Sequence, residues 1–238
     1  MNTKKSFHQL ASLIFGVCIM TAFSSCSEHR VESGPRLHVD TFEELTIDGT
    51  YEVKFSPLNS SVGGVTNVKA KIQVIADQIS IGLKVIDSPP MTTHSQFIHN
   101  STECPAEIDD VNGDGFIDPM EASSVLNEVL IPLDGNLNSQ EEGTAQFPVS
   151  NSVGAYTYFQ EGILSSLIED LSMLGHDQKL KLEGKVMVIY GIPEDTYLPG
   201  SIQNIGTTSD RAALPIACGK ISRKILDESE TSEPDTDV

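Results

Sequence analysis

The chain has 238 residues, contains no tryptophan, and carries a formal net charge of −19. This length suits one large β domain or two small ones and gives enough residues for a substantial core. We expect no nucleic acid partner, because so acidic a surface repels phosphates, and a surplus of carboxylates suits a calcium-rich exterior.

The first 25 residues have the pattern of an export signal. Lys4 and Lys5 form a positive end, and residues 10–23 form an apolar core that is too short to remain as a membrane-spanning helix. We therefore interpret residues 1–25 as a signal peptide that carries the protein out of the cytoplasm.

The end of this segment, Phe23-Ser24-Ser25-Cys26, resembles the lipobox of bacterial lipoproteins, with phenylalanine in the place of the usual leucine. The resemblance implies that Cys26 becomes a lipidated N-terminus and that the chain's partner is a membrane. The residue after the cysteine is Ser27 and not an aspartate, which in Gram-negative bacteria implies sorting to the outer membrane of the cell envelope. The alternative is an ordinary cleaved signal peptide and a periplasmic or secreted protein.

The rest of the chain divides into three parts by composition. Residues 26–44 form the lipid anchor and a tether, and residues 45–224 form the folded domain. Residues 225–238 form an acidic tail with few aliphatic side chains, which we expect to be disordered. The protein partner of the chain is unknown from the sequence.

The four cysteines leave one pair in the folded part. Cys18 lies within the signal peptide and Cys26 at its end, so Cys104 and Cys218 remain. Because the chain is expected in an oxidising compartment, we predict that these two form a disulfide.

Alternation of apolar and polar residues predicts antiparallel strands early in the domain. Residues 51–55 alternate over one short strand. Residues 68–74 and 79–85 alternate on both sides of a turn at Ala76-Asp77-Gln78, which makes them the clearest hairpin in the sequence. Residues 94–99 are predicted to form a further strand.

Residues 110–121 match a calcium-binding loop of twelve residues. Alternating polar side chains at the start converge on one centre, Gly115 allows a sharp turn, and the last residue offers two oxygens. The pattern resembles the EF-hand family over this loop and the following helix. The predicted Ca²⁺ ligands are Asp110, Asn112, Asp114, the backbone carbonyl of Phe116, Asp118 and Glu121. The alternative is a turn rich in aspartate and glycine that binds nothing.

The surroundings of the loop differ from a complete EF-hand. Pro105 disfavours an entering helix, whereas Pro119 suits the first turn of an exiting helix. The apolar positions of that helix are Ala122, Val125, Leu126 and Val129. With no second loop to pair with, the affinity is expected to be weak, about 0.1 to 1 mM.

The second half of the domain contains one further helix. Residues 131–148 read as a polar connection, and residues 155–159 as a strand. Leucine and isoleucine recur at helical spacing over residues 163–174, and Gly175 ends this second short helix. Residues 185–190 and 216–221 are predicted strands.

Residues 184–195 and 217–221 resemble two segments of the copper/zinc superoxide dismutase family. In that family, the first of these segments carries a copper-ligand histidine. The order of a histidine strand, a loop cysteine and a terminal cysteine is also kept. CHRD domains share a similar plan. The resemblance implies a mainly β fold, an antiparallel Greek-key-type β-sandwich, into which the EF-hand-like calcium loop is inserted.

The departures from that family bear on catalysis. Tyr190 stands where a copper-ligand histidine is expected, and the family's run of zinc-ligand histidines is missing. His94 and His99 are five residues apart, so on a strand they point to opposite faces and cannot both bind one ion. Redox chemistry requires copper held mainly by imidazoles. We therefore expect no catalysis, and expect these histidines to be hydrogen-bonded.

Three hypotheses follow. The first is an exported β-sandwich protein in which Ca²⁺ orders a long insertion without catalysis. The second is a divergent superoxide dismutase-like metalloenzyme that uses His94 or His99. The third is a surface adhesion module that depends on calcium.

Overall fold

The structure is a computed structural model, and it describes residues 48–65, 67–138, 146–176 and 180–225. The signal peptide, Cys26, the tether and the acidic tail after residue 225 lie outside the described residues, so what the sequence predicts for them stays a prediction. No helix within the described residues is long and apolar enough to cross a membrane.

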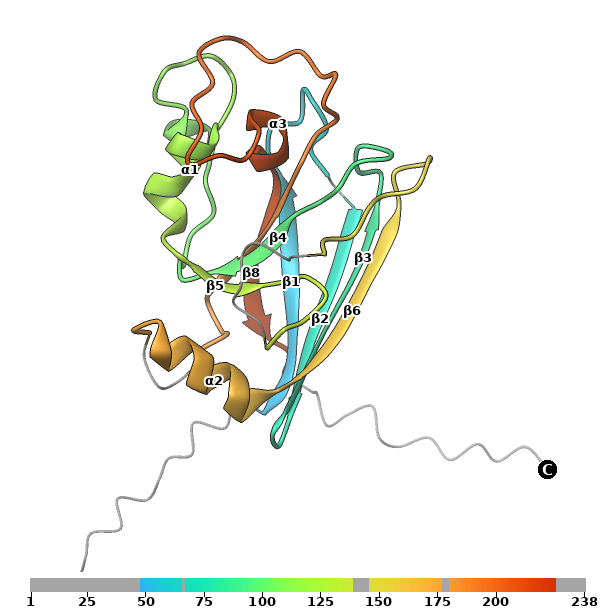
Figure 1. Cartoon of the computed structure of the whole chain (residues 1–238), viewed down its shortest axis with the longest axis vertical. Helices are drawn as coiled ribbons and strands as arrows, with labels where there is room; N and C mark the ends of the chain where they lie inside the picture. The colour runs from blue at the N-terminus through green and yellow to red at the C-terminus, as the bar shows by residue number, and fades with distance from the viewer. Residues whose placement is uncertain (1–47, 66, 139–145, 177–179, 226–238) are drawn as a thin grey trace, which may run out of the picture. The chain divides into compact units, whose positions relative to one another are not determined.

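Eight antiparallel strands of the described chain form one curled sheet, in the order β5-β4-β7-β8-β1-β2-β3-β6 (Figure 1). This confirms the mainly β, antiparallel fold, in which the sandwich is a single sheet that bends over on itself. The strands are β1 (Gly49–Pro57), β2 (Asn67–Ile75), β3 (Gln78–Ile86), β4 (Gln96–His99), β5 (Val129–Pro132), β6 (Tyr156–Ile163), β7 (Val186–Tyr190) and β8 (Pro215–Arg223).

The hairpin of β2 and β3 shows why the sequence pattern produces strands. Alternate side chains of both strands are buried, and Ile72 lies opposite Ile81 with neither exposed. The strands meet at Ala76-Asp77, where Ala76 adopts a φ of 51°. Because a strand has a period of two, this register places Ile72, Val74, Ile79, Ile81, Leu83 and Val85 together on the buried face, whereas Ile75 at the turn is exposed. Burying each aliphatic side chain contributes about 1.5–3 kcal/mol.

The curl of the sheet brings its two ends together. The Tyr156 hydroxyl in β6 donates to Gln96 Oε1 in β4 at 3.2 Å. The His94 ring stacks on the Tyr156 ring with 5.2 Å between centroids, and His94 is fully buried. Just before β6, Gly154 accepts a hydrogen bond from the backbone of Ser88, and a Cβ on this glycine would lie 2.0 Å from the Ser88 carbonyl. A glycine is therefore required where these chain segments cross.

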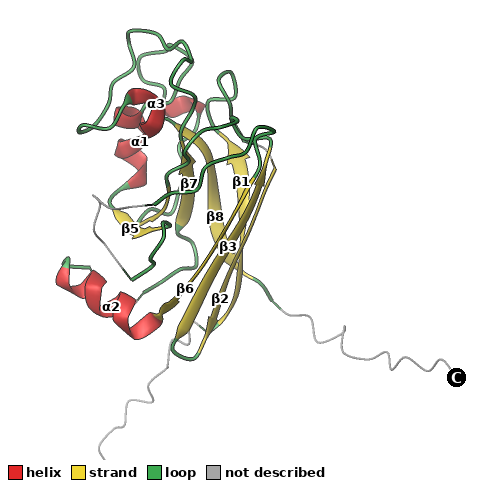
Figure 2. Ribbon diagram, turned by 45° about the vertical axis from the view of Figure 1, so that its right-hand side comes forward, coloured by secondary structure: helices red, strands yellow, loops and turns green. Residues whose placement is uncertain are grey.

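In the described part of the chain, three α-helices and one turn of 3-10 helix accompany the sheet, where two short helices were predicted. They are η1 (Glu107–Asp109), α1 (Pro119–Leu126), α2 (Leu164–Met173) and α3 (Asp210–Ala213). The helices lie on one side of β2, β3 and β6 in both views (Figure 2). The additional helix, α3, has only four residues and no apolar stripe that would reveal it in the sequence.

The boundary at residue 131 was predicted wrongly. Residues 131–148 were expected to be a polar connection, but they begin with the end of β5. The helix before them stops at Leu126, because Asn127 adopts a φ of 45°, and Val129 belongs to the strand. A strand of only four residues is too short to show a clear period in sequence.

The edge strand β6 ends against a side chain. Asn138 Nδ2 donates to the Ile163 carbonyl at 2.9 Å, and its Oδ1 accepts from the Ile163 N–H at 3.1 Å. The carboxamide thus forms the two bonds that a neighbouring strand would form with this residue.

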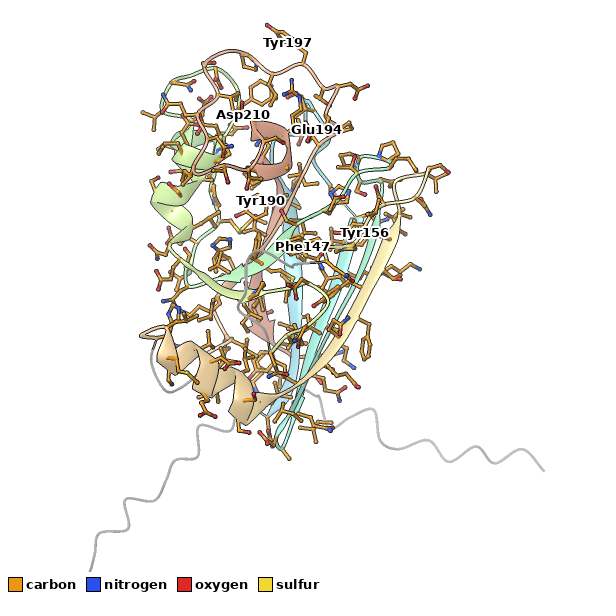
Figure 3. The ribbon with its side chains drawn as sticks, viewed as in Figure 1. Phe147, Tyr156, Tyr190, Glu194, Tyr197 and Asp210 are labelled. Carbon is orange, nitrogen blue, oxygen red and sulfur yellow. A yellow bond between two sulfur atoms is a disulfide. The ribbon has the colours of Figure 1, made fainter. Side chains whose placement is uncertain are left out.

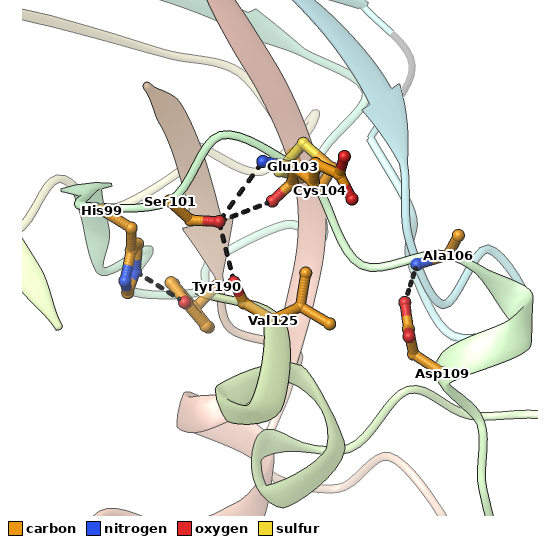
Figure 4. The surroundings of a disulfide bond; sticks show 9 residues. His99, Ser101, Glu103, Cys104, Ala106, Asp109, Val125 and Tyr190 are labelled. Carbon is orange, nitrogen blue, oxygen red and sulfur yellow. Dashed lines mark hydrogen bonds between the residues drawn. A yellow bond between two sulfur atoms is a disulfide. The ribbon is translucent and has the colours of Figure 1, made fainter. Parts of the chain in front are cut away.

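A disulfide ties the loop after β4 to the centre of the sheet. Cys104 and Cys218 are bonded, as predicted, with Cα atoms 5.8 Å apart and a sequence separation of 114 residues. Cys218 lies in β8 and is buried. Beside the bond, Ser101 Oγ donates to the carbonyls of Glu103 and Val125 (Figure 4). The insertion that contains η1 and α1 is therefore anchored at its start.

Replacing both cysteines, Cys104→Ser with Cys218→Ser, is expected to lower the free energy of unfolding by about 4–5 kcal/mol, because the unfolded chain regains the freedom of a loop of this length. Denaturant unfolding measures the loss. Alkylation of the unreduced protein is the control and is expected to find neither thiol free. A double variant as stable as the wild type would contradict the assigned anchoring role.

Candidate metal centre

Residues 110–121 run from η1 into the first turn of α1. Asp118 is the N-cap of α1, where its Oδ1 accepts from the Glu121 N–H at 2.9 Å. Glu121 Oε2 accepts in return from the Asp118 N–H at 3.0 Å. This capping box satisfies two N–H groups that the helix leaves free, and Pro119 at the first position needs no such partner. The helix start thereby fixes the last two predicted ligands relative to each other.

The first predicted ligand organises the beginning of the loop. Asp110 Oδ1 accepts from the N–H groups of Gly113 and Asp114 at 2.8 and 3.1 Å, and Oδ2 accepts from Gly115 at 2.8 Å. Asn112 Oδ1 accepts from the Asp114 N–H at 2.9 Å. Gly113 and Gly115 have φ values of 71° and 86°, which favour glycine. The backbone therefore wraps closely around the first carboxylate.

The last predicted ligand reaches back to the beginning of the loop. Glu121 Oε1 accepts from the N–H groups of Val111 and Asn112, at 2.8 and 3.2 Å. Phe116 donates to Asp114 Oδ1 at 2.9 Å and packs against the main core. The two ends of the loop are thus joined through one carboxylate.

Within the described residues, no group of three or more His, Cys, Asp or Glu side chains is arranged to hold a metal ion. The carboxylates of the loop bond its own N–H groups instead. The potential donors are all oxygens, which suits a hard cation such as Ca²⁺ better than copper or zinc. Calcium binding stays a prediction.

Asn59 supports the loop, and sequence reasoning missed it. Its Oδ1 accepts from the Ile117 N–H at 2.8 Å, and its Nδ2 donates to the Ile117 carbonyl at 2.9 Å. Nδ2 also donates to the Pro215 carbonyl at the start of β8, at 2.9 Å. Reciprocal bonds to one residue are those of an antiparallel strand pair. We call this arrangement the Asn59 clamp; its only sequence signal is an asparagine in a turn.

A second support comes from the long connection between β7 and α3. Gln203 donates its N–H to Asp118 Oδ2 at 2.7 Å and accepts from the Met120 N–H at 3.3 Å. Ser201 Oγ donates to Asp114 Oδ2. Figure 3 shows Tyr197, in the middle of this connection, above α3. Two predicted ligands therefore hold a distant segment of the chain against the loop.

The two histidines are buried and bonded to different groups. His94 Nδ1 lies 3.0 Å from the Tyr190 carbonyl, and Nε2 lies 3.3 Å from the Pro89 carbonyl. His99 Nδ1 lies 3.2 Å from the Asn127 carbonyl, and Nε2 lies 2.9 Å from the Tyr190 hydroxyl. Burial lowers the pKa of both imidazoles and raises the pKa of the Tyr190 hydroxyl.

This arrangement does not fit a copper centre. His94 stacks on Tyr156, whereas His99 contacts the edge of Phe97, so the two rings have different surroundings. Each ring nitrogen already has an oxygen within hydrogen-bonding distance; His94 bonds the Tyr190 carbonyl, and His99 bonds the Tyr190 hydroxyl (Figure 4). Copper held mainly by imidazoles needs several of them to converge, and these two do not.

The sequence matches no protein-family model and no curated protein. Among solved structures, a double mutant of a SOD-like protein from Bacillus subtilis is 16% identical with a TM-score of 0.36, covering 71% of this chain and 95% of that one. The Cu/Zn superoxide dismutase from Brucella abortus is 13% identical with a TM-score of 0.33, covering 72% and 98%. The clock protein EA4 is 10% identical with a TM-score of 0.35, covering 74% and 96%. Likeness at this distance carries no functional conclusion.

Removing the Asn59 clamp is expected to destabilise the protein. Asn59→Gly leaves the N–H and carbonyl of Ile117 and the Pro215 carbonyl without their partner, at about 1–3 kcal/mol for each buried group left unsatisfied. Glycine tolerates the φ of 48° at this position, so the loss reports the carboxamide and not the backbone. Denaturant unfolding measures it.

The matched control is Asn127→Gly, which replaces another asparagine of positive φ, 45°. The Asn127 side chain donates from Nδ2 to the Asn100 backbone carbonyl, and this hydrogen bond is exposed. Its unfolding free energy is expected to change by less than about 1 kcal/mol. Equal effects of the two substitutions would show that the clamp has no special role.

Proposed function

We propose that this chain is an exported protein, anchored by a lipid at Cys26 in the cell envelope, that binds one Ca²⁺ in the loop of residues 110–121. The ion serves a structural purpose in this proposal, and no catalytic step is assigned. The ligands are the six groups named from the sequence: Asp110, Asn112, Asp114, the Phe116 carbonyl, Asp118 and Glu121.

One observation carries the proposal most. The Glu121 carboxylate lies across the loop, on the N–H groups of Val111 and Asn112. A twelve-residue calcium loop needs its final carboxylate to close over its first ligands. The backbone turn that brings these groups together is already formed by Gly113 and Gly115. In this proposal, the ion takes the place of the N–H groups that these side-chain oxygens bond.

The electrostatics of the loop also favour a cation. Asp110, Asp114, Asp118 and Glu121 place four carboxyl groups within twelve residues, and no lysine or arginine lies among them. Like charges this close repel each other, and a divalent ion removes that repulsion. Asp114 and Asp118 also accept hydrogen bonds from Ser201 and Gln203. An ion that fixes these two carboxylates therefore also orders the connection between β7 and α3.

Two observations support export. The N-terminal 25 residues have the pattern of a signal peptide. The Cys104–Cys218 bond in the folded domain is of the kind that persists in oxidising compartments and is rare in the cytosol. Millimolar calcium, the range in which an unpaired loop of this type is half saturated, is also found outside the cell.

Calorimetric titration of the wild type is expected to show one Ca²⁺ per chain with a dissociation constant of about 0.1–1 mM. Saturation at one hundred times that constant adds about 2.7 kcal/mol to the unfolding free energy. Glu121→Gln is expected to abolish the heat of binding, because one of its two anionic oxygens becomes an amide.

The matched control is Glu107→Gln, which removes one exposed negative charge from the neighbouring 3-10 helix. It is expected to leave the affinity within about two-fold of the wild type. Thermal melting of Glu121→Gln checks that the variant is still folded, because Glu121 also belongs to the capping box of α1. Unchanged affinity of Glu121→Gln would reject the loop as the site.

Lipidation is tested separately. Cys26→Ser is expected to move the protein from the membrane fraction to the soluble fraction, because a serine cannot carry the anchoring acyl chains. Cys18→Ser, within the signal peptide, is the control and is expected to leave the protein in the membrane fraction. An intact mass of the exported wild type without acyl chains would refute the anchor.

A further inference from the structure

The outer face of the sheet gathers positive charge in a chain that is otherwise strongly acidic. Among the described residues, five lysines of β1, β2, β3 and β8 point away from the core. The net charge of the whole chain is −19, so this concentration of one sign is unusual. The five are Lys54, Lys69, Lys71, Lys84 and Lys220.

Four of these lysines form one row across the strands. Lys220 in β8 lies opposite Lys54 in β1, and Lys69 in β2 lies opposite Lys84 in β3. Val53 pairs with Ala70, which places the next residues of β1 and β2, Lys54 and Lys69, beside each other. We call these four residues the lysine row. At about 4.8 Å between neighbouring strands, the row spans roughly 14 Å.

The lysine row is unfavourable for the sheet alone. Like charges directly opposite each other on neighbouring strands destabilise a sheet. None of the four lysines has an ion-pair partner within the described part of the chain, and the nearby Glu52 is paired with Lys224 at 3.3 Å. An extended anion laid across the strands would remove this repulsion along the whole row.

The same face provides room for such an anion. A shallow groove of about 650 Å³ runs over β2 and β3, lined by Lys69, Lys71 and Lys84 and by one acid, Glu52, which lies opposite Lys71. The Phe159 ring, 63% exposed, lies over Gly82, where a Cβ would be 3.5 Å from it, and Phe159 lines the groove. An extended peptide segment fits a groove of this kind, with its backbone near the aromatic ring and its acids near the amines.

We propose that the lysine row binds the chain's own acidic segment, residues 227–237. This segment has six acids and no basic residue: Asp227, Glu228, Glu230, Glu233, Asp235 and Asp237. It continues from β8, which carries Lys220 and ends at Arg223. Eleven residues reach at most about 40 Å, which exceeds the length of the row.

Covalent attachment makes this occupant favoured over an external one. A segment joined by a short connection has an effective concentration in the millimolar range at the face. The contacts are exposed ion pairs, which are individually weak and screened by salt. The segment therefore occupies the groove at low ionic strength and leaves it as the salt concentration rises. While bound, it shields the row from other polyanions.

The test is zero-length carbodiimide cross-linking of the exported full chain, followed by peptide mass spectrometry. At low salt, residues 227–237 are expected to cross-link within monomers to the lysine row, with Lys181 as an exposed reference amine outside the sheet. At 1 M salt, where the screening length is about 3 Å, the yield is expected to fall about five-fold or more. Lys69→Gln with Lys84→Gln is expected to lower the yield of links to the remaining Lys54 and Lys220 and to melt like the wild type or higher.

Three results would overturn the proposal. Links to Lys181 as frequent as links to the lysine row would show that the segment has no preferred place. Links found only in covalent dimers would assign the face to a second copy of the chain. A variant with the six acids changed to amides that elutes from heparin at the same salt as the wild type would show that the segment does not cover the face.

Discussion

A single buried carboxamide joins the candidate metal loop to the sheet, and the arrangement of this part of the molecule depends on it. Asn59 follows β1, yet its three hydrogen bonds reach Ile117 in the loop and Pro215 at the start of β8. Each bond alone contributes about 1 kcal/mol. Together they fix the middle of an insertion whose ends are held elsewhere, by the Cys104–Cys218 bond and by the helix α1.

The insertion has no second loop beside it among the described residues, and the chain replaces that partner with side chains. The carboxamide of Asn59 provides the reciprocal bonds of a strand pair to Ile117, and Gln203 provides a backbone donor and acceptor on the other side. Loops without such contacts lose much conformational entropy on binding an ion, whereas a loop that is already ordered loses less. The affinity expected from sequence, that of an isolated loop, is in this respect a lower bound.

Local pattern and spacing were sufficient where neighbours in sequence are neighbours in space. The period of two gave the hairpin of β2 and β3, and the twelve-residue spacing gave the turn of residues 110–121 and the helix after Pro119. Contacts between distant segments leave no such pattern. The bond from Tyr156 to Gln96 that curls the sheet, the Asn59 clamp and the approach of Gln203 each join residues at least 58 positions apart. The four-residue strand β5 is too short to repeat any period.

Tyr190 holds the two histidines apart, since its backbone carbonyl lies beside His94 and its hydroxyl beside His99. The sheet also has an exposed edge, the strand β6. A strand with unbonded N–H and carbonyl groups recruits other chains and so promotes fibre formation. Asn138 occupies the last residue of β6 with its own amide. An incoming strand therefore meets an occupied position at that end, and the protein is protected there against edge-to-edge polymerisation.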